Sequence, residues 1–262
     1  MTLLEAEAAV DKFDAPLYTQ AEASRYLGLA QSTFRHWSRG CPTVVGGREV
    51  SGRPVITAVG KVGHGRPAIP FIGLAEGYTL AAIRKSGVPL QRIRPALERL
   101  NQEMGLQHAL ASEKLFTDGA EVLFDYADRT GGEDAKAVQE LVVVRDGQRI
   151  FTEVVEGYLQ RIVFGADGFA TAVPLPGFEH ADLVADVRRS FGQPIFTHGG
   201  ARLEDALSLF LAGEELTVVA EEYGIPYLEL EDAVGPGRTR GSRAAACRPL
   251  KGSVEQVTAR SV

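Results

Sequence analysis

The chain has little of what a secreted or membrane protein needs. Only two of its 262 residues are cysteine, Cys41 and Cys247, and they stand far apart with no CxxC spacing. This usage is typical of a reducing compartment, and a chain of this length buries enough surface to fold without disulfides or a structural metal. No apolar run approaches the roughly 18 residues of a membrane span. The first ten residues carry Glu5 and Glu7 in place of a basic, apolar leader. We therefore expect a cytoplasmic protein that does not enter a membrane.

The sequence also lacks the common signatures of a catalytic or cofactor site. It has no Walker-type Gly-Lys-Ser/Thr, and Gly63-His64-Gly65 has neither the third glycine nor the strand and helix of a dinucleotide site. His198 has no second His, Cys or carboxylate cluster at the spacing of metal ligands. We find no set of nucleophile, base and acid. The sequence predicts a protein that is not an enzyme and that uses no metal or cofactor.

What the chain does have is a strong segregation of charge. Residues 19–100 contain 12 Lys and Arg against 4 Asp and Glu, whereas residues 101–234 contain 9 against 25. The tail, residues 235–262, contains 6 against 1. Because like charges gathered in one segment repel one another, the segregation indicates different partners for different segments. The plainer interpretation is two domains with unequal surface charge.

The basic segment opens with the pattern of a short, capped helix. Thr19 is placed to cap a helix, and Glu22 three residues later completes a capping box. Ala23, Tyr26 and Leu27 fall on one helical face. Gly28 then follows, and glycine readily takes the left-handed conformation that ends a helix.

A second helix follows at the spacing of a helix-turn-helix. Ser32 is placed to cap it, and Phe34 and Trp37 fall inward at i, i+3. Trp37 is therefore expected in the core and not as a platform for a base. The outward side chains suit a reader of the DNA major groove, because they reach base edges and phosphates. These predicted DNA-binding residues are Gln31, Thr33, Arg35, His36 and Arg39.

The stretch from Tyr18 to Trp37 resembles the DNA-binding domain of MerR-type regulators. The resemblance implies a β wing and then two more helices. Residues 44–72 are β-prone and broken by glycines, and helical patterns follow over Leu74–Ser86 and Pro89–Met104. The wing region is longer than usual, and its basic residues are expected to contact phosphates. These predicted phosphate contacts are Arg48, Arg53, Lys61 and Arg66.

The acidic middle of the chain is dominated by alternating patterns. Residues 141–151 read as a hairpin around Asp146-Gly147, and residues 161–173 read as a second hairpin around Gly165 to Gly168. Thr152 to Gln160 predicts a helix between them. Leu115 to Phe124 is interpreted as earlier strands around Asp118-Gly119. We expect a small unit of helices and strands with no chemistry of its own.

Residues 190–234 resemble the small helical domain of one class of VapB-type antitoxins. The matching residues are Gly192, Pro194, Ile195, Arg202, Leu203, Leu207, Ala212, Gly213, Val219, Ala220, Gly224 and Ile225. Thr217 is placed to cap the second helix of this domain. Glu229, Glu231 and Asp232 then occupy the third helix, where a DNA reader would carry basic residues. This helix-turn-helix is better suited to holding a protein.

The whole pattern predicts an α+β fold in four parts. They are a winged helix-turn-helix over residues 15–104, a small β-rich middle unit over 105–182, a C-terminal helix-turn-helix-like domain over 183–234, and a basic flexible tail over 235–262. The tail has too little apolar content to pack by itself. Its Arg238, Arg240 and Arg243 are predicted to bind a toxin.

The resemblance implies an antitoxin that represses its own operon and neutralises a PIN-domain ribonuclease. Its partners would then be operator DNA and a cognate VapC-type toxin. A homodimer is expected because operator readers of this size usually bind paired half-sites. A MerR-like regulator that senses a small molecule, without a toxin, is the alternative.

Overall fold

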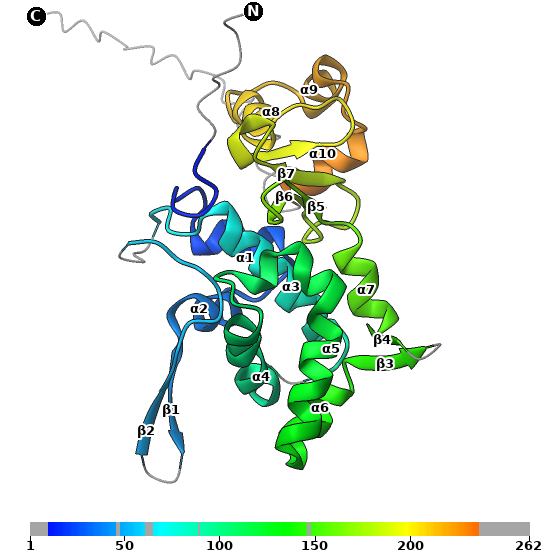
Figure 1. Cartoon of the computed structure of the whole chain (residues 1–262). Helices are drawn as coiled ribbons and strands as arrows, with labels where there is room; N and C mark the ends of the chain where they lie inside the picture. The colour runs from blue at the N-terminus through cyan, green and yellow to red at the C-terminus, as the bar shows by residue number, and fades with distance from the viewer. Residues whose placement is uncertain (1–9, 46–47, 61–64, 89, 146–147, 236–262) are drawn as a thin grey trace, which may run out of the picture.

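The N-terminal part begins with two short helices, α1 (Gln20–Tyr26) and α2 (Gln31–Arg39), and an antiparallel hairpin of β1 (Cys41–Val45) and β2 (Arg48–Gly52). Helices α3 (Phe71–Lys85) and α4 (Leu90–Glu103) follow. These elements belong to a computed structural model that describes residues 10–45, 48–60, 65–88, 90–145 and 148–235 (Figure 1). The predicted helix-turn-helix, its wing hairpin and the two later helices are all present.

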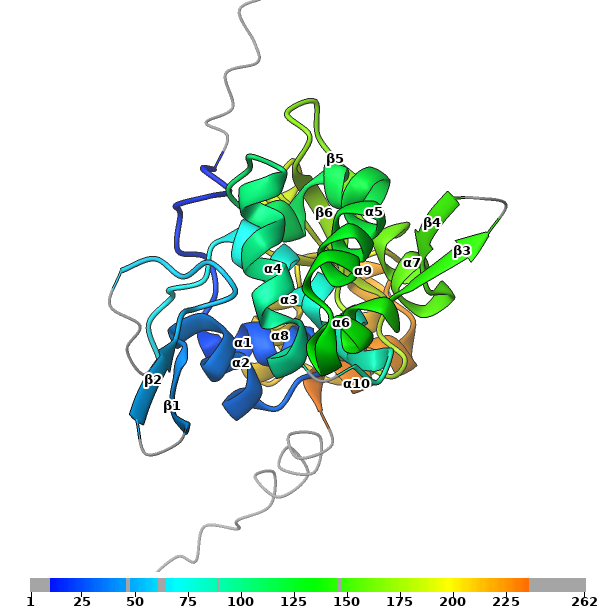
Figure 2. The same ribbon diagram turned by 60° about the horizontal axis from the view of Figure 1, so that its bottom comes forward.

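Helix α3 is the centre of the core. Its side chains from Phe71 to Ile83 are buried on every side, and the helix lies in the middle of the molecule in Figure 2. A helix that is apolar all round must be enclosed by other elements. Gly77 allows the helix-turn-helix to approach closely, because a Cβ there would lie 2.8 Å from the Leu27 side chain and 3.1 Å from Phe34. The helix-turn-helix is thereby packed onto the central helix.

The middle region is more helical than the sequence analysis predicts. After a 3₁₀ turn, η1 (Ala109–Ala111), come α5 (Glu113–Thr130) and α6 (Gly132–Gln139). The strands predicted within Leu115–Phe124 are therefore wrong. Ser112 caps α5 by accepting a hydrogen bond from the Leu115 amide, and Leu115, Leu123 and Ala127 are buried along one side. The "β-rich" description of this unit is corrected in the same way.

The predicted hairpins of the middle region are confirmed. Strands β3 (Val142–Arg145) and β4 (Gln148–Phe151) pair antiparallel, and α7 (Glu153–Leu159) follows. Strands β5 (Val163–Phe164), β6 (Ala170–Pro174), β7 (Leu183–Asp186) and β8 (Pro194–Phe196) form a four-stranded antiparallel sheet in that order. The sheet takes strands from both sides of residue 182, and the domain boundaries remain predictions.

Three helices complete the described chain: α8 (Leu203–Leu211), α9 (Leu216–Tyr223) and α10 (Tyr227–Val234). A 3₁₀ turn, η2 (Ser190–Gly192), lies between β7 and β8. In Figure 1 the three helices lie at the top, at the opposite end from the wing hairpin. Within the described residues, none of the helices has both the length and the apolar character required to cross a membrane.

Some local expectations for the wing and the helix starts are wrong. Val55 and Ile56 do not extend the wing, because their amides donate to the Trp37 carbonyl, and Ile69 forms a bridge with Tyr18.

Helix α2 has Ala30 at its N-cap, so Ser32 lies inside the helix. Thr217 likewise lies inside α9, whose N-cap is Glu215. In each case the helix begins one residue before the side chain that is expected to cap it.

Candidate DNA interface and partner surface

The first helix and the turn are fixed by local hydrogen bonds. The Glu22 amide donates to Thr19 Oγ1 at 3.1 Å, and the Thr19 amide donates to Glu22 Oε2 at 2.8 Å, as the predicted capping box requires. The apolar face of Ala23, Tyr26 and Leu27 is buried, also as predicted. Gly28 has φ +65°, a conformation that glycine takes without a Cβ penalty. The turn therefore sets α2 at a defined angle to α1.

The second helix presents a mixed face, and not all of its predicted readers point fully outward. Phe34 and Trp37 are buried, which confirms their place in the core. Gln31, His36 and Arg39 are exposed, whereas Thr33 and Arg35 are half-buried. Arg35 Nε is itself buried and, within the described part of the chain, makes no hydrogen bond. The expectation that Arg35 lies entirely on the outer face is thus corrected.

A further cation lies beside this helix that the sequence analysis missed. Arg84, in the last turn of α3, donates from Nη1 to Thr33 Oγ1 at 3.1 Å. It is exposed, as is the next residue, Lys85. The two are separated from α2 by about 50 positions, so only the fold brings them together. The one signal in the sequence was a basic pair just before Gly87, at a predicted helix end.

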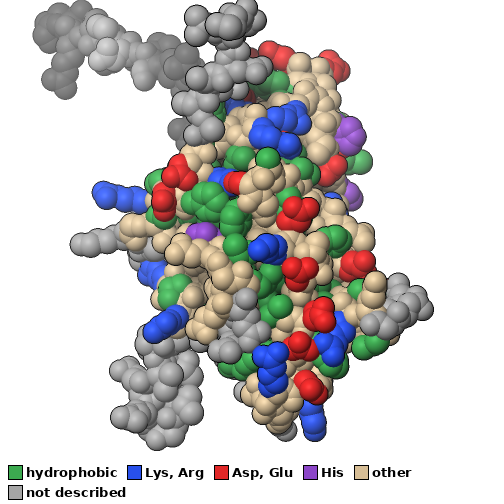
Figure 3. Space-filling view, viewed as in Figure 1, with side chains coloured by type: hydrophobic (Ala, Val, Ile, Leu, Met, Phe, Trp, Pro, Cys, Tyr) green, Lys and Arg blue, Asp and Glu red, His purple; other side chains and the backbone are tan. Residues whose placement is uncertain are grey.

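The wing and the segment that follows it carry the other predicted cations. Arg48 begins β2 opposite Val45, and Arg53 and Arg66 are exposed, while Lys61 lies outside the described residues. The Arg53 carbonyl accepts a hydrogen bond from Nη1 of Arg94 on α4. Figure 3 shows Lys and Arg side chains beside the wing at the lower left, without Asp or Glu next to them. Over α5 and α6, in contrast, both signs of charge alternate.

A buried carboxylate anchors the segment that returns from the wing. Glu76 of α3 accepts a hydrogen bond from the Thr57 amide, and its Oε1 lies 3.0 Å from His108 Nδ1. This hydrogen bond and the negative charge of Glu76 raise the pKa of His108 above its usual value. The close packing continues at Gly73, where a Cβ would lie 2.2 Å from the Thr57 carbonyl oxygen. The base of the wing is therefore fixed to the central helix.

The three C-terminal helices have a different electrostatic character. Residues 203–235 contain nine Asp and Glu and no Lys or Arg. Exposed carboxylates occur in α8, in the turn and in α9, at Glu204, Glu214, Glu215, Glu221 and Glu222. Such a surface repels a phosphate backbone.

Two carboxylates of α10 do not contribute to that surface, which corrects the interpretation of this helix. Asp232 Oδ2 accepts hydrogen bonds from the amides of His180 and Ala181, at 2.7 and 3.0 Å. Glu229 is buried, and it accepts from the Asp182 amide at 3.3 Å and lies 2.7 Å from His198 Nδ1. These two side chains hold α10 against the loop between β6 and β7. His198 is thereby explained as a structural histidine.

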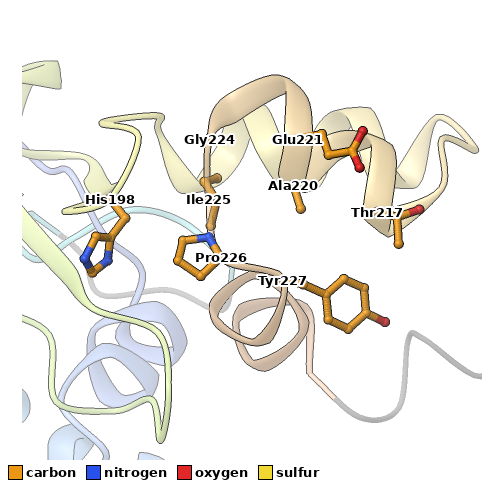
Figure 4. A pocket seen from close by; sticks show the side chains of 8 residues that line it. All are labelled: His198, Thr217, Ala220, Glu221, Gly224, Ile225, Pro226 and Tyr227. Atoms are coloured by element: carbon orange, nitrogen blue, oxygen red, sulfur yellow. The ribbon is translucent and has the colours of Figure 1, made fainter.

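An open groove of about 500 Å³ lies between α9 and the start of α10 (Figure 4). Its lining residues are His198, Thr217, Ala220, Glu221, Gly224, Ile225, Pro226 and Tyr227. Four large apolar side chains of the same three helices are exposed to solvent: Leu211, Val218, Tyr227 and Leu228. Apolar side chains surrounded by carboxylates form the usual pattern of a protein-binding surface.

The helix-turn-helix is in direct contact with the C-terminal part. Gly177 donates its amide to the Tyr26 carbonyl at 2.9 Å, and a Cβ at Gly177 would lie 1.7 Å from the Arg25 carbonyl oxygen. The Arg25 guanidinium donates to the Ala233 carbonyl at the end of α10 and lies 5.2 Å from the Phe178 ring centroid. The two surfaces therefore belong to parts that pack against each other.

Other predicted features lie elsewhere or outside the description. Arg238, Arg240 and Arg243 are outside the described residues. In the ranges that are described, no three His, Cys, Asp or Glu side chains gather in a way that could hold a metal ion.

The comparisons with known proteins agree with this geometry. The model of a family described as "putative DNA-binding HTH domain" matches residues 16–97, which cover α1, α2, the wing and α3. A protein of Mycobacterium tuberculosis (strain ATCC 25618 / H37Rv) named "putative antitoxin VapB45" is 44% identical over 226 residues, covering 85% of this chain and 94% of the relative.

A solved structure is similar over the same extent. The crystal structure of Rv2018 from Mycobacterium tuberculosis is 43% identical and superimposes with a TM-score of 0.70, covering 85% of this chain and 99% of that one. The helix-turn-helix and the relation to VapB antitoxins, both expected from the sequence, are thus confirmed. The chain belongs to the family of the putative antitoxin VapB45.

Proposed function

We propose that the chain is the antitoxin of a type II toxin–antitoxin pair, a non-enzymatic regulator that represses its own operon. The observation that carries this proposal is the pairing of two unlike surfaces in one molecule. An exposed cationic face surrounds α2, and an acidic face with exposed apolar side chains covers α8 to α10. The first suits DNA and the second suits a protein.

On operator DNA, α2 enters the major groove and the wing follows the phosphates, as its MerR-like pattern implies. His36 and Gln31 are exposed polar side chains on α2, and Arg84 and Arg39 extend the cationic face. Arg53, Arg66 and the wing residues Arg48 and Lys61 contact the backbone. Operators of this kind are read as paired half-sites, so the chain acts as a homodimer on DNA.

The toxin partner is a PIN-domain ribonuclease, as proposed for a VapB-type antitoxin. Such nucleases hold Mg²⁺ with clustered carboxylates. Arg238, Arg240 and Arg243 of the tail supply guanidinium groups that fork onto these carboxylates and mask them. The apolar face of α8 to α10 contacts the body of the toxin.

The DNA-binding part is tested with the full chain and its own upstream region in a gel-shift assay titrated with salt. The double variant His36→Ala/Arg84→Ala should bind far more weakly than the natural chain. Lys136→Ala removes an exposed cation of α6 and serves as the control. Equal affinities for all three proteins would refute this placement of the DNA interface.

The toxin-binding part is tested by co-expression with the neighbouring nuclease gene. The complex should co-purify and leave RNA uncut, and a chain that ends at Gly235 should fail to silence the nuclease. Full silencing by the shortened chain would assign inhibition to the folded helices. A neighbouring nuclease that the full chain neither binds nor silences would favour the alternative, a small-molecule regulator.

A further inference from the structure

The acidic face of α8 to α10 has a partner of opposite charge within the same chain. The 27 residues that follow Gly235 contain six Lys and Arg and one Glu. Residues 203–235 contain no Lys or Arg and nine Asp and Glu, of which Glu229 and Asp232 are engaged by backbone amides of residues 180–182. The segment begins directly at the end of α10. Two adjacent segments of one chain are thus complementary in charge.

The groove between α9 and α10 offers the apolar part of such a contact. Thr217, Ala220, Glu221 and Gly224 lie at i, i+3, i+4 and i+7 on one face of α9 and its C-cap, and Tyr227 closes the groove (Figure 4). The exposed Leu228 lies beside Tyr227 in α10, and Glu221 places a carboxylate in the lining. Residues 244–262 include the apolar residues Leu250, Val254 and Val257 among basic residues. The segment therefore matches the groove both in its charge and in its apolar side chains.

The distance to the groove is short compared with the length of the segment. Tyr227 is at the start of α10, about 11 Å from its end at a rise of about 1.5 Å per residue. Cys247 stands 12 residues beyond Gly235, which allows it to reach any point within about 40 Å. Attachment at the other end of the same short helix also gives the segment a high effective concentration at the groove.

We propose that residues 236–262 occupy the groove between α9 and α10 when no other protein is bound. The same arginines that the proposed function assigns to the toxin are then held on the carboxylates of their own chain. A partner that uses this face must displace them, which lowers its apparent affinity by the fraction of chains in the open state. The occupancy concerns the chain alone, so its test contains no nuclease and no DNA. Its failure would leave the proposed function untouched.

The test traps the contact through the natural Cys247 in the full-length protein. In a Cys41→Ser background, Thr217→Cys places a thiol in the groove, and Ser208→Cys places one on an exposed position of α8 that does not line it. Under mild oxidation, the disulfide of Cys247 with the thiol introduced by Thr217→Cys should form at least about tenfold faster than the control disulfide, because docking raises the local thiol concentration. High salt should reduce the difference, since it screens the ion pairs.

Three outcomes would overturn the proposal. Equal intramolecular rates for the two variants would show that the segment does not select the groove. A faster reaction in the Ser208→Cys variant would place it on another face. A disulfide-linked dimer, seen by non-reducing electrophoresis, would assign the groove to a second copy of the chain.

Hydrogen exchange gives an independent test. Residues 217–228 should exchange more slowly in the full chain than in a variant with Arg238, Arg240 and Arg243 changed to Ala, which would support the contact between the segment and the groove.

Discussion

The molecule contains two helical hairpins, α1–α2 and α8–α9, that have much in common and carry opposite charge. Each joins two helices of seven to nine residues through a short turn with a glycine in the left-handed region, Gly28 in the first and Gly213 in the second. Yet the first is surrounded by exposed cations and the second by exposed carboxylates. The comparison teaches that similar helical hairpins can carry outer faces of opposite charge, and under the proposed function these faces suit different partners.

The two hairpins also differ in how they begin. A side-chain capping box starts α1, whereas none of α8, α9 and α10 has a side-chain cap. The C-terminal helices are instead held from outside, by the contacts of Glu229 and Asp232 with the loop after β6. We infer that the N-terminal hairpin is specified more locally than the C-terminal one.

The largest effect is expected where the two regions meet. Gly177→Ala places a Cβ against the Arg25 carbonyl and should destabilise the protein by about 3 kcal/mol or more, as overpacking in a tight contact does. Gly157→Ala in α7 is the matched control, because a Cβ there meets open space and should stabilise the helix by about 0.5–1 kcal/mol. Thermal unfolding measures both. Similar melting temperatures for the two variants would show that the contact is dispensable.

The charge contrast is sharpened by removing single cations from the N-terminal face. Arg84→Ala should weaken operator binding by about 1–3 kcal/mol if its guanidinium contacts a base. Arg53→Ala and Arg66→Ala should weaken binding to all sequences and reduce the salt slope by about one each, as lost phosphate contacts do. Binding isotherms at several salt concentrations separate the two classes. If the salt dependence of binding is unchanged in both Arg53→Ala and Arg66→Ala, these two arginines do not belong to the DNA interface.

The acidic region is expected to use its carboxylates unequally. Glu229→Ala leaves the Asp182 amide and His198 without their acceptor and should cost about 1–3 kcal/mol of stability. Glu231→Ala, two residues further along α10, should change stability by less than about 0.5 kcal/mol. Chemical denaturation of the two variants makes the measurement. A loss of equal size in both would mean that charge alone, and not the buried contact, determines the effect.

A smaller effect should appear with pH at the base of the wing. Because Glu76 raises the pKa of His108 in the folded protein, the stabilisation is complete below the usual pKa of about 6.5 and is lost as pH rises through the folded value. The free energy of unfolding should therefore fall over the range above pH 6.5. His108→Gln should make this part of the profile flat. A profile that is identical in the variant would assign the pH dependence to other groups.

Features of the N-terminal region that depend on near neighbours could be predicted from the sequence. The Thr19–Glu22 capping box, the turn at Gly28 and the burial of Phe34 and Trp37 all follow from spacings of a few residues. The hairpins around residues 146–147 and 165–168 also follow from local turn chemistry. The resemblance to VapB antitoxins depended on such spacings within residues 190–234.

Features that depend on distant partners could not be predicted. Arg84 reaches Thr33 only because α3 packs on the helix-turn-helix through Gly77. The spacing of the carboxylates in α10 predicts an exposed acidic face. Nothing in that spacing reveals that Glu229 and Asp232 accept hydrogen bonds from the amides of residues 180–182. Asp118-Gly119 resembles a turn and so predicts strands over residues 115–124, whereas burial against β4 stabilises a helix there.

The contact at Gly177 also bears on how such proteins are recombined. A DNA-binding domain that is joined to the rest of a protein only by a linker can be exchanged at a single junction in the chain. Here any replacement for α1 must place a backbone carbonyl against Gly177 and a cation within hydrogen-bonding distance of the end of α10. It must also place an aromatic ring beside Phe178. If α2 reads the operator as proposed, substitutions on its outer face should change operator specificity more readily than transplanting another helix-turn-helix.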